Sequence, residues 1–278
     1  MIAVAEGVPG DGAQPSSLGE VACLTYHAVL PHESEYLYNV SVSQLSEHLA
    51  AFCNPKVRLP IGARLPSISF DDGHISAFEY AFPLLEAAGI KATFFVLPGK
   101  IGRSPDSLSW QQVKLMLSAG HRIESHGWSH GMLTQYSASD LEREIVSSKL
   151  ELEDRLGQPV TSLSAPGGRW NERVVEECAR AGYKTLFHSN PWAAVRRMDG
   201  VVVRGRLMVT RKTGEIELFG FTNASALTRM VHSTSYAIKL GVRGVLGEQL
   251  YHSLWCKLAN FRPADGMEVK TNGSVHAE

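Results

Sequence analysis

Short apolar runs alternate with segments of helical periodicity between residues 21 and 187 of the chain. The apolar runs predict buried strands at 21–26, 65–70, 92–97, 160–165 and 183–187, with a shorter strand running into His126. Between them, apolar residues recur at helical spacing until a glycine ends the segment, as at Gly89, Gly157 and Gly182. Strands that alternate with helices in this way predict a parallel sheet with right-handed crossovers, either open or closed into a barrel.

Polar residues mark the expected starts of four helices in the same region. Ser41 with Gln44, Ser109 with Gln112, and Ser139 with Glu142 have capping-box spacing, and Asn171 precedes a further apolar periodic segment. These signals place the helices between the predicted strands and fix their expected first turns.

The pattern changes after residue 200. Residues 201–209 and the alternating stretch 215–218 predict strands that close or flank the sheet, and residues 222–260 have helical periodicity. We therefore divide the chain into a disordered leader (1–18), a barrel domain (19–220), a helical C-terminal appendage (221–262) and a disordered tail (263–278).

Composition excludes several classes of protein. The 278 residues include 27 Lys and Arg and 28 Asp and Glu, so a net charge of -1 provides no general attraction for nucleic acid. Residues 196–262 hold eleven Arg or Lys and four Asp or Glu, 11 - 4 = +7, which favours an anionic partner. The basic helices near the C-terminus either pack on the barrel or make weak contact with a membrane surface.

The N-terminus shows neither a basic flank nor an apolar run of signal-peptide length, and the expected location is cytoplasmic. A reducing compartment agrees with the four cysteines, which have no CxxC spacing and are expected to be free thiols: Cys23, Cys53, Cys178 and Cys256.

Three polar clusters follow predicted strands, at residues 69–73, 125–130 and 165–170. The carboxyl ends of parallel strands meet at one rim, so these clusters should converge although they are remote in sequence. His27, which follows the first strand, is expected near the same rim, or else beneath a loop as a hydrogen-bonded structural histidine.

Asp72, His126 and His130 combine one carboxylate with two imidazoles, a ligand set that leaves open positions on a divalent metal. Asp71, next to the presumed ligand Asp72, is then available as a base that takes a proton from metal-activated water. The residues therefore indicate a metal-dependent hydrolase.

The clusters resemble the motifs of the polysaccharide deacetylases, the nodulation-protein-B-like carbohydrate esterases. Ser-Phe-Asp-Asp-Gly at 69–73 is similar to their first motif, His-Gly-Trp-Ser-His at 126–130 to their second and, more loosely, residues 164–168 to their third. The resemblance covers roughly residues 20–190. It implies a distorted (β/α) barrel of about seven parallel strands and hydrolysis of an N-acetyl group from an amino sugar or glycan.

The resemblance also implies roles for single residues. Asp71 would be the general base, and Asp72, His126 and His130 would hold the metal, most often zinc, with cobalt, nickel or manganese as alternatives. The family's late histidine, the general acid, has two candidates here, His188 and His232.

The third motif departs from the family pattern, because Ser164 stands where many relatives have an arginine that orients the base. Arg169 is a candidate to replace it or to bind a substrate phosphate or carboxylate, or else it simply faces solvent. We expect substrate contacts from the same loop and the next: Pro166, Gly167, Gly168, Arg169, Trp170 and Trp192, with a backbone N–H near Gly167 or Gly168 facing the oxyanion and the tryptophans stacking on sugar.

Two alternatives remain open from the sequence. One is deacylation of a different amide, for example in a secondary metabolite, on the same metal scaffold. The other is a catalytically silent carbohydrate-binding relative, suggested by the missing arginine and acid. An iron oxygenase with two histidines and one carboxylate fits poorly, because the strand-helix alternation differs from the all-β scaffold usual for that class.

Overall fold

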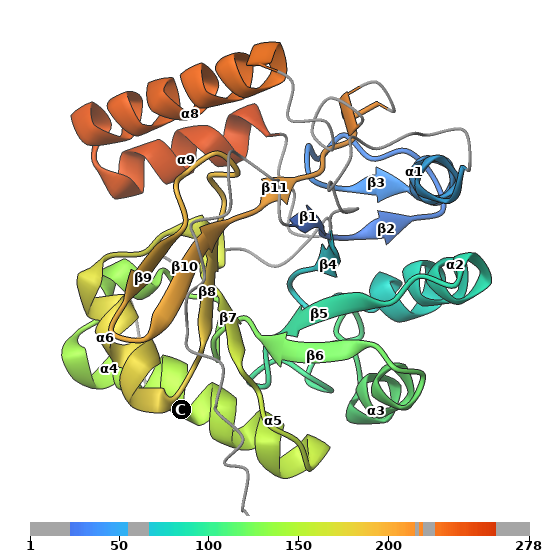
Figure 1. Cartoon of the computed structure of the whole chain (residues 1–278), viewed down its shortest axis with the longest axis horizontal. Coiled ribbons are helices and arrows are strands. Elements are labelled where there is room, and N and C mark those ends of the chain that lie inside the picture. Colours follow the sequence, from blue (N-terminus) through green and yellow to red (C-terminus); the bar gives the residue numbers. More distant parts are fainter. Residues whose placement is uncertain (1–22, 55–66, 215–216, 219–225, 260–278) are drawn as a thin grey trace, which may run out of the picture.

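A curled sheet of nine strands forms the centre of the molecule (Figure 1). The computed structural model describes residues 23–54, 67–214, 217–218 and 226–259. The strands in order across the sheet are β11 (Leu207–Met208), β1 (Cys23–Tyr26), β4 (Ser67–Phe70), β5 (Ala92–Val96), β6 (Arg122–Ser125), β7 (Ser162–Ser164), β8 (Thr185–His188), β10 (Val201–Gly205) and β9 (Arg196–Met198). Only β9 on β10 pairs antiparallel in this sheet.

The predicted distorted (β/α) barrel is confirmed, with eight parallel strands in the described residues where about seven were expected. The difference arises because residues 201–208 supply two strands. Val202 to Gly205 pair with β8, whereas Leu207 and Met208 pair with β1 at the opposite end of the sheet. Arg206 lies at the change of partner, and its N–H donates to the His188 carbonyl at 2.7 Å. This segment therefore bridges the two ends of the curled sheet and closes the barrel.

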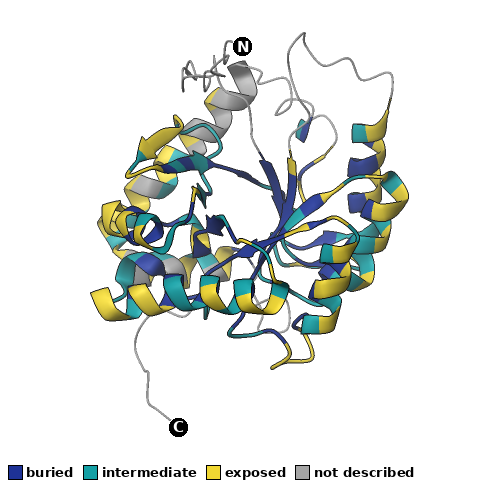
Figure 2. Ribbon diagram, turned by 60° about the horizontal axis from the view of Figure 1, so that its bottom comes forward, coloured by how far each residue is buried: buried dark blue, intermediate teal, exposed yellow. Residues whose placement is uncertain are grey.

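Helices cover the outside of the sheet, and their exposed faces contrast with the buried strands (Figure 2). A small parallel pair, β2 (Val29–Leu30) and β3 (Val40–Ser41), precedes the first helix. The helices are α1 (Val42–Cys53), α2 (Phe82–Ala88), α3 (Trp110–Ser118), α4 (Ala138–Glu142), α5 (Ser148–Leu156), α6 (Glu172–Ala181), α8 (Ala226–Leu246) and α9 (Glu248–Leu258). One π-helical turn (Ala77–Ala81) precedes α2, and another (Arg143–Ser147) joins α4 to α5.

Most predicted helix boundaries are confirmed by their hydrogen bonds. The hydroxyls of Ser41 and Ser109 accept from the amides three residues later, and Asn171 caps α6 in the same way. The predicted cap at Ser139 is wrong. Ser137 starts α4 by accepting from the Asp140 amide, so the helix begins two residues earlier than its apolar periodicity suggests.

Stacked aromatic rings line the face of β1, β4 and β5 that packs against the outer helices. Phe70 stacks between Tyr26 and Phe94, with ring centroids 5.3 and 5.1 Å apart, and all three side chains are buried. Aromatic pairs of this kind add about 0.5–1.5 kcal/mol each beyond the apolar area that they bury. The strand ends next to this packed core are consequently rigid supports for the polar residues that follow them.

The predicted C-terminal helices are present as the antiparallel pair α8 and α9, which pack side by side (Figure 1). The alternation at 215–218 did not predict the structure correctly, since Glu217 and Leu218 are helical and the Leu218 amide donates to the Gly214 carbonyl. In the described part of the chain, no helix has the length and apolarity needed to cross a membrane. The predicted leader and tail lie outside the described residues.

Candidate active site

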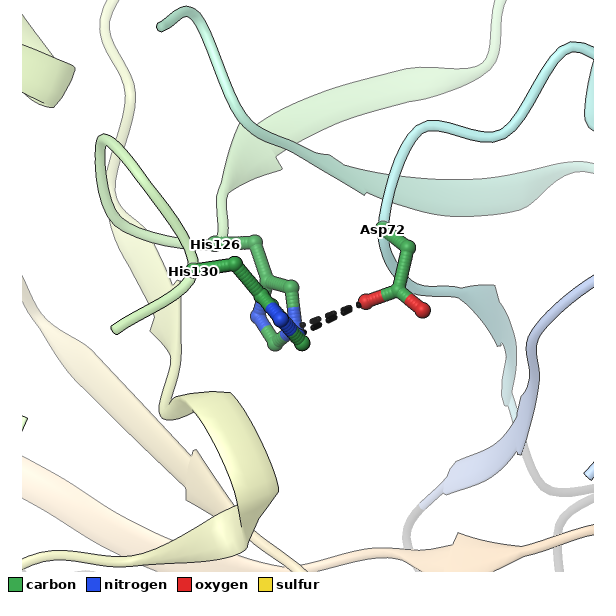
Figure 3. Close-up of side chains that lie close together, drawn as sticks. All are labelled: Asp72, His126 and His130. Atoms are coloured by element: carbon green, nitrogen blue, oxygen red, sulfur yellow. Dashed lines mark ion pairs between the residues drawn. The ribbon is translucent and has the colours of Figure 1, made fainter. Parts of the chain in front are cut away.

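Asp72, His126 and His130 converge at the carboxyl ends of the strands (Figure 3). Asp72 follows β4, His126 follows β6, and His130 lies four residues further along the same loop. The Asp72 Oδ1 atom is 3.2 Å from His126 Nε2 and 3.0 Å from His130 Nε2. One ligand atom from each residue lies within 4.8 Å of the other two, so the predicted trio can hold one metal ion.

The backbone is strained at two of these three positions. Asp72 has φ 74° and His130 has φ 73°, in the left-handed region that side-chain-bearing residues rarely adopt. Such conformations cost about 1–3 kcal/mol each and persist only where surrounding contacts hold them. Here the strain turns the side chains of both residues toward His126, which points to a function for this geometry.

Further contacts hold the His126 ring and the loop that carries His130. The Nδ1–H of His126 donates to the Ser164 carbonyl at 2.8 Å, which leaves the lone pair of Nε2 directed at Asp72. The buried Glu144 fixes the loop that carries His130: one carboxylate oxygen accepts from the amides of Trp128 and Ser129, both at 3.0 Å, and the other accepts from the Ser129 hydroxyl at 2.5 Å. These contacts orient the ligands before any ion binds.

The residues of this trio suit a divalent cation. Asp72 Oδ1 is buried and makes no hydrogen bond within the described residues, although two imidazole nitrogens face it. A buried carboxylate oxygen without a donor is costly unless a cation neutralises it. Burial works to raise the pKa of Asp72, but the positive charge of His130 and the two imidazoles that face the carboxylate hold that pKa well below its usual value.

Asp71 lies beside the trio and is bound by a different partner. Arg206 donates to both of its oxygens, from Nη1 to Oδ1 at 2.8 Å and from Nη2 to Oδ2 at 2.7 Å, and the Ser164 hydroxyl donates to Oδ2 at 3.0 Å. Burial works to raise the pKa of Asp71, but the charge of Arg206 outweighs it, and the pKa is lowered. Asp71 is therefore ionised at neutral pH and oriented by a bidentate pair.

The role of Arg206 could not be assigned from the sequence. Its guanidinium is buried between two aromatic rings, 4.9 Å from the centroid of Phe95 and 5.5 Å from that of Phe187. The only sequence feature that pointed to Arg206 was its place, as a charged residue, in the otherwise mostly apolar stretch 201–208. A charge at that position must have a buried partner.

Arg169 does not take the place of the missing arginine. It is buried, donates to the Met132 sulfur at 2.9 Å, and lies 5.7 Å from the ring centroid of Tyr251 in α9. Burial, together with the charge of Arg243, lowers its pKa to about 10. Ser164 and Arg206 together hold Asp71 instead, and a substrate contact by Arg169 stays a prediction.

His27 lies close to the same centre, as the strand pattern suggested. Burial lowers its pKa, and the charges of Asp72 and Asp71 oppose that effect, which places the ring within electrostatic reach of both carboxylates. Its ring is 5.3 Å from that of Tyr38. The first strand thus contributes an imidazole to the rim.

His188, the candidate acid, ends β8 and is buried under Trp170, whose ring centroid is 5.8 Å from its own. Its Nδ1 accepts from the Asn190 amide at 3.1 Å, so the neutral ring carries its proton on Nε2. Burial, with the charges of Arg206 and Arg196, lowers its pKa to about 4, so the ring is neutral at pH 7. Its role as general acid stays a prediction. The other candidate, His232, lies in α8, and its side chain is outside the described residues.

The third cluster forms a tight turn from Pro166 to Gly168 directly after β7. Gly168 has φ 66°, and a Cβ there would lie 1.9 Å from the Ser189 hydroxyl oxygen, so only glycine fits. The Gly168 amide donates to the Ala165 carbonyl at 2.8 Å, which leaves Gly167 as the candidate oxyanion donor of the pair. Trp170 and Trp192 are half-buried and pack against the core, and sugar stacking by either stays a prediction.

The fold is a distorted (β/α) barrel, and the Asp72, His126 and His130 trio at its rim could hold a metal ion. Residues 61–186 match the family model for polysaccharide deacetylases. The chain therefore carries a polysaccharide deacetylase domain, as its three clusters indicated.

Similar proteins support this assignment. Bacillus subtilis YxkH is 33% identical over 129 residues, which cover 46% of each chain. A peptidoglycan-N-acetylglucosamine deacetylase of Bacillus cereus is 30% identical over 49% of this chain and 63% of its own, and Listeria monocytogenes PgdA, of the same name, is 32% identical over 40% and 23%. The chain thus spans between about a quarter and two thirds of these relatives.

Solved structures share the fold at low sequence identity. The Streptococcus pyogenes deacetylase PplD, in complex with acetate, matches 73% of this chain and 98% of its own with a TM-score of 0.64 and 23% identity. IcaB from Ammonifex degensii matches 74% and 97%, with a TM-score of 0.61 and 22% identity. The distorted barrel is therefore the fold of this group of deacetylases.

We predict that Glu144→Gln weakens zinc binding by about 10- to 100-fold, because the loop that carries His130 loses a charged acceptor for two amides. Competition with a chromophoric chelator measures the affinity. Glu142→Gln, at an exposed neighbouring position, is the matched control and should bind zinc normally. Equal affinities for the two variants would show that Glu144 does not organise the site.

Proposed function

We propose that this protein hydrolyses an N-acetyl group from an amino sugar within a glycan, a lipid-linked sugar or a small glycoside, and releases acetate and a free amine. The observation that carries the proposal is the pair of adjacent aspartates with separate partners. Asp72 faces His126 and His130, whereas Asp71 is bound by Arg206. Metal binding and proton transfer thus fall to different carboxylates.

Asp72, His126 and His130 would hold the ion, for which zinc is our first candidate. Nitrogen and oxygen ligands in this ratio also suit cobalt, nickel or manganese. When bound, a divalent ion of this kind acidifies water and polarises a carbonyl group as a Lewis acid.

Asp71 acts as the general base in this proposal. Its Oδ2 atom is 3.8 Å from His126 Nε2, so the carboxylate lies next to the candidate metal ligands but is not one of them. Because Arg206 keeps it ionised and fixes its plane, it accepts a proton from the attacking water with little reorganisation.

The leaving nitrogen must be protonated before the amine departs. His188 at the end of β8 is our candidate donor; to act as an acid its ring must first take up a second proton, which burial and the charges of Arg206 and Arg196 disfavour. Gly167, in the turn after β7, is the candidate for stabilising the oxyanion through its amide. Both groups belong to the rim on which Asp71 lies.

Relatives suggest the substrate class. Two proteins similar over part of this chain are named as peptidoglycan-N-acetylglucosamine deacetylases, and one from Pestalotiopsis, 29% identical over 43% of this chain, is named as a chitin deacetylase. All three names describe polymers of N-acetylated amino sugars. We therefore place an N-acetylglucosamine unit first among the candidate substrates.

The structure weakens one argument for the alternative that this chain is a carbohydrate-binding relative without catalytic activity. A carbohydrate-binding relative without activity was suggested by the missing third-motif arginine, yet Arg206 supplies the bidentate contact to Asp71. Deacylation of a different amide uses the same residues and differs only in substrate. An acetate assay over a panel of N-acetyl sugars and other N-acyl amides distinguishes the two.

Asp71→Asn should keep zinc and lower the rate of acetate release from chito-oligosaccharides by about 10²- to 10⁴-fold, because the amide cannot accept the proton. His126→Ala should lose the metal itself. Metal content by elemental analysis and acetate by a coupled assay separate these effects. Full turnover by zinc-loaded Asp71→Asn would refute the base assignment.

The pH profile tests Arg206 as the residue that positions and charges the base. Arg206 lowers the pKa of Asp71, and activity needs the ionised carboxylate. Its removal should therefore raise that pKa and move the acidic limb of kcat/KM to higher pH.

We expect this shift in Arg206→Met, and a smaller one in Arg206→Lys, which keeps a charge without the fork. Arg211→Gln, at an exposed arginine on the same segment, is the control and should leave the limb in place. An unshifted acidic limb in Arg206→Met would contradict the role given to Arg206.

A further inference from the structure

The outer surface of the C-terminal helix pair is unusually apolar. Seven of the ten large hydrophobic side chains that are exposed in the described residues lie on these two helices. We call them the hairpin face: Met230, Ile238, Val242, Val245, Leu250, Leu254 and Leu258, exposed by between 39% and 87%. An apolar concentration of this kind on one element indicates an interaction surface.

The spacing of these residues places them along one side of each helix. In α8, Ile238, Val242 and Val245 follow one another at intervals of four and three residues. In α9, Leu250, Leu254 and Leu258 recur every four residues. Residues three or four apart share a helix face, so each helix presents a continuous apolar stripe to solvent.

Side chains of α9 beside this stripe are already used. The Trp255 side chain hydrogen-bonds the Tyr38 hydroxyl, and the Tyr251 ring lies against the Arg169 guanidinium. The Leu37 amide donates to the Ala259 carbonyl at 3.0 Å. These contacts attach α9 to the rim that holds the candidate active site, and in the described part of the chain the hairpin face stays exposed.

Basic side chains flank one end of this face. Lys257 is exposed beside Leu258 at the end of α9. Arg211 and Lys212, also exposed, are brought there because the Arg211 amide donates to the Leu37 carbonyl at 3.0 Å while Leu37 contacts Ala259. The apolar stripes thus end near three cations, with the exposed Glu33 and Glu35 on either side of Ser34, whose carbonyl accepts from the Arg211 guanidinium at 2.9 Å.

We propose that the hairpin face docks on an anionic lipid bilayer, with its apolar side chains in the interfacial layer and Lys257, Arg211 and Lys212 at the acidic head groups. Amphipathic helices bind bilayers through this combination of apolar area and positive charge. The contact is peripheral, in keeping with the lack of a membrane-spanning helix in the described part of the chain.

Charge favours a bilayer over a second copy of the chain. A symmetric dimer through this face would place the basic end of one copy against a surface with few acidic partners, because residue i of one copy meets residue j of the other. Within residues 226–258 the sequence holds four Lys or Arg and a single Glu. An acidic lipid surface instead complements the cations.

Vesicle flotation with the full chain tests the proposal, using phosphatidylcholine alone and phosphatidylcholine mixed with phosphatidylglycerol. The unmodified chain should bind the mixed vesicles, and its binding should decrease as the salt concentration is raised. The triple variant Ile238→Asp, Val245→Asp, Leu254→Asp should partition at least about tenfold less. Replacing Arg211, Lys212 and Lys257 by Gln should lower partitioning roughly 100-fold.

Control variants carry two changes of the same kind elsewhere on the surface. Leu115→Asp with Leu150→Asp, at exposed leucines on α3 and α5, and Lys114→Gln with Arg143→Gln should bind as the unmodified chain does. Thermal unfolding confirms that each variant is folded. Binding is measured without substrate, so the outcome does not depend on the proposed deacetylation.

Three outcomes would overturn the proposal. The first is that the unmodified chain fails to float with anionic vesicles. The second is that the hairpin variants float as well as the control variants. Alternatively, light scattering shows a dimer that the triple aspartate variant dissociates, which would make the face a contact between two copies.

Discussion

The buried ion pair between Arg206 and Asp71 is the interaction on which the rest of the site depends. Both side chains are almost fully buried, and taking such charges out of water costs several kcal/mol per ion unless they are well paired. The bidentate contact, the Ser164 hydroxyl and two flanking aromatic rings provide that pairing. In return, the carboxylate stays ionised in a place where burial alone would protonate it.

Barrel closure brings the two partners together. The segment that carries Arg206 leaves β8 and joins β1, so its arginine points into the rim at the junction between the ends of the sheet. Asp71 and Asp72 are neighbours in the chain, yet the left-handed conformation of Asp72 directs it to the imidazoles. One tight turn thereby gives two adjacent carboxylates two different environments and two different tasks.

The sequence predicted the parts of this structure that local pattern determines. Strand and helix positions, the glycine ends of helices, and the convergence of Asp72, His126 and His130 all followed from periodicity and from the rule that strand ends meet. Arg206 could not be found in this way, because 135 residues separate it from Asp71 and the contact depends on a change of strand partner. Ser137 was missed for a related reason, since several serines near that helix start have similar capping potential.

Because Arg206 binds Asp71, the departure of this chain from the family's third motif at Ser164 has a structural explanation. Ser164, at the position of the family's arginine, is a relay between Arg206 and Asp71, because it donates to the carboxylate while accepting from the guanidinium. The same residue offers its carbonyl to His126, so base and metal ligand are held by one strand end. The departure from the family pattern is therefore a different route to the same orientation of the base.

A double-mutant cycle on the metal-free protein tests this account most directly. The free energy of unfolding in urea is measured for the unmodified chain, Asp71→Asn, Arg206→Met and the double variant. We expect each single change to cost about 3–5 kcal/mol, because it leaves one buried charge unpaired, and the double variant to cost clearly less than their sum. Additive effects would show that Arg206 and Asp71 are not coupled and would contradict the account.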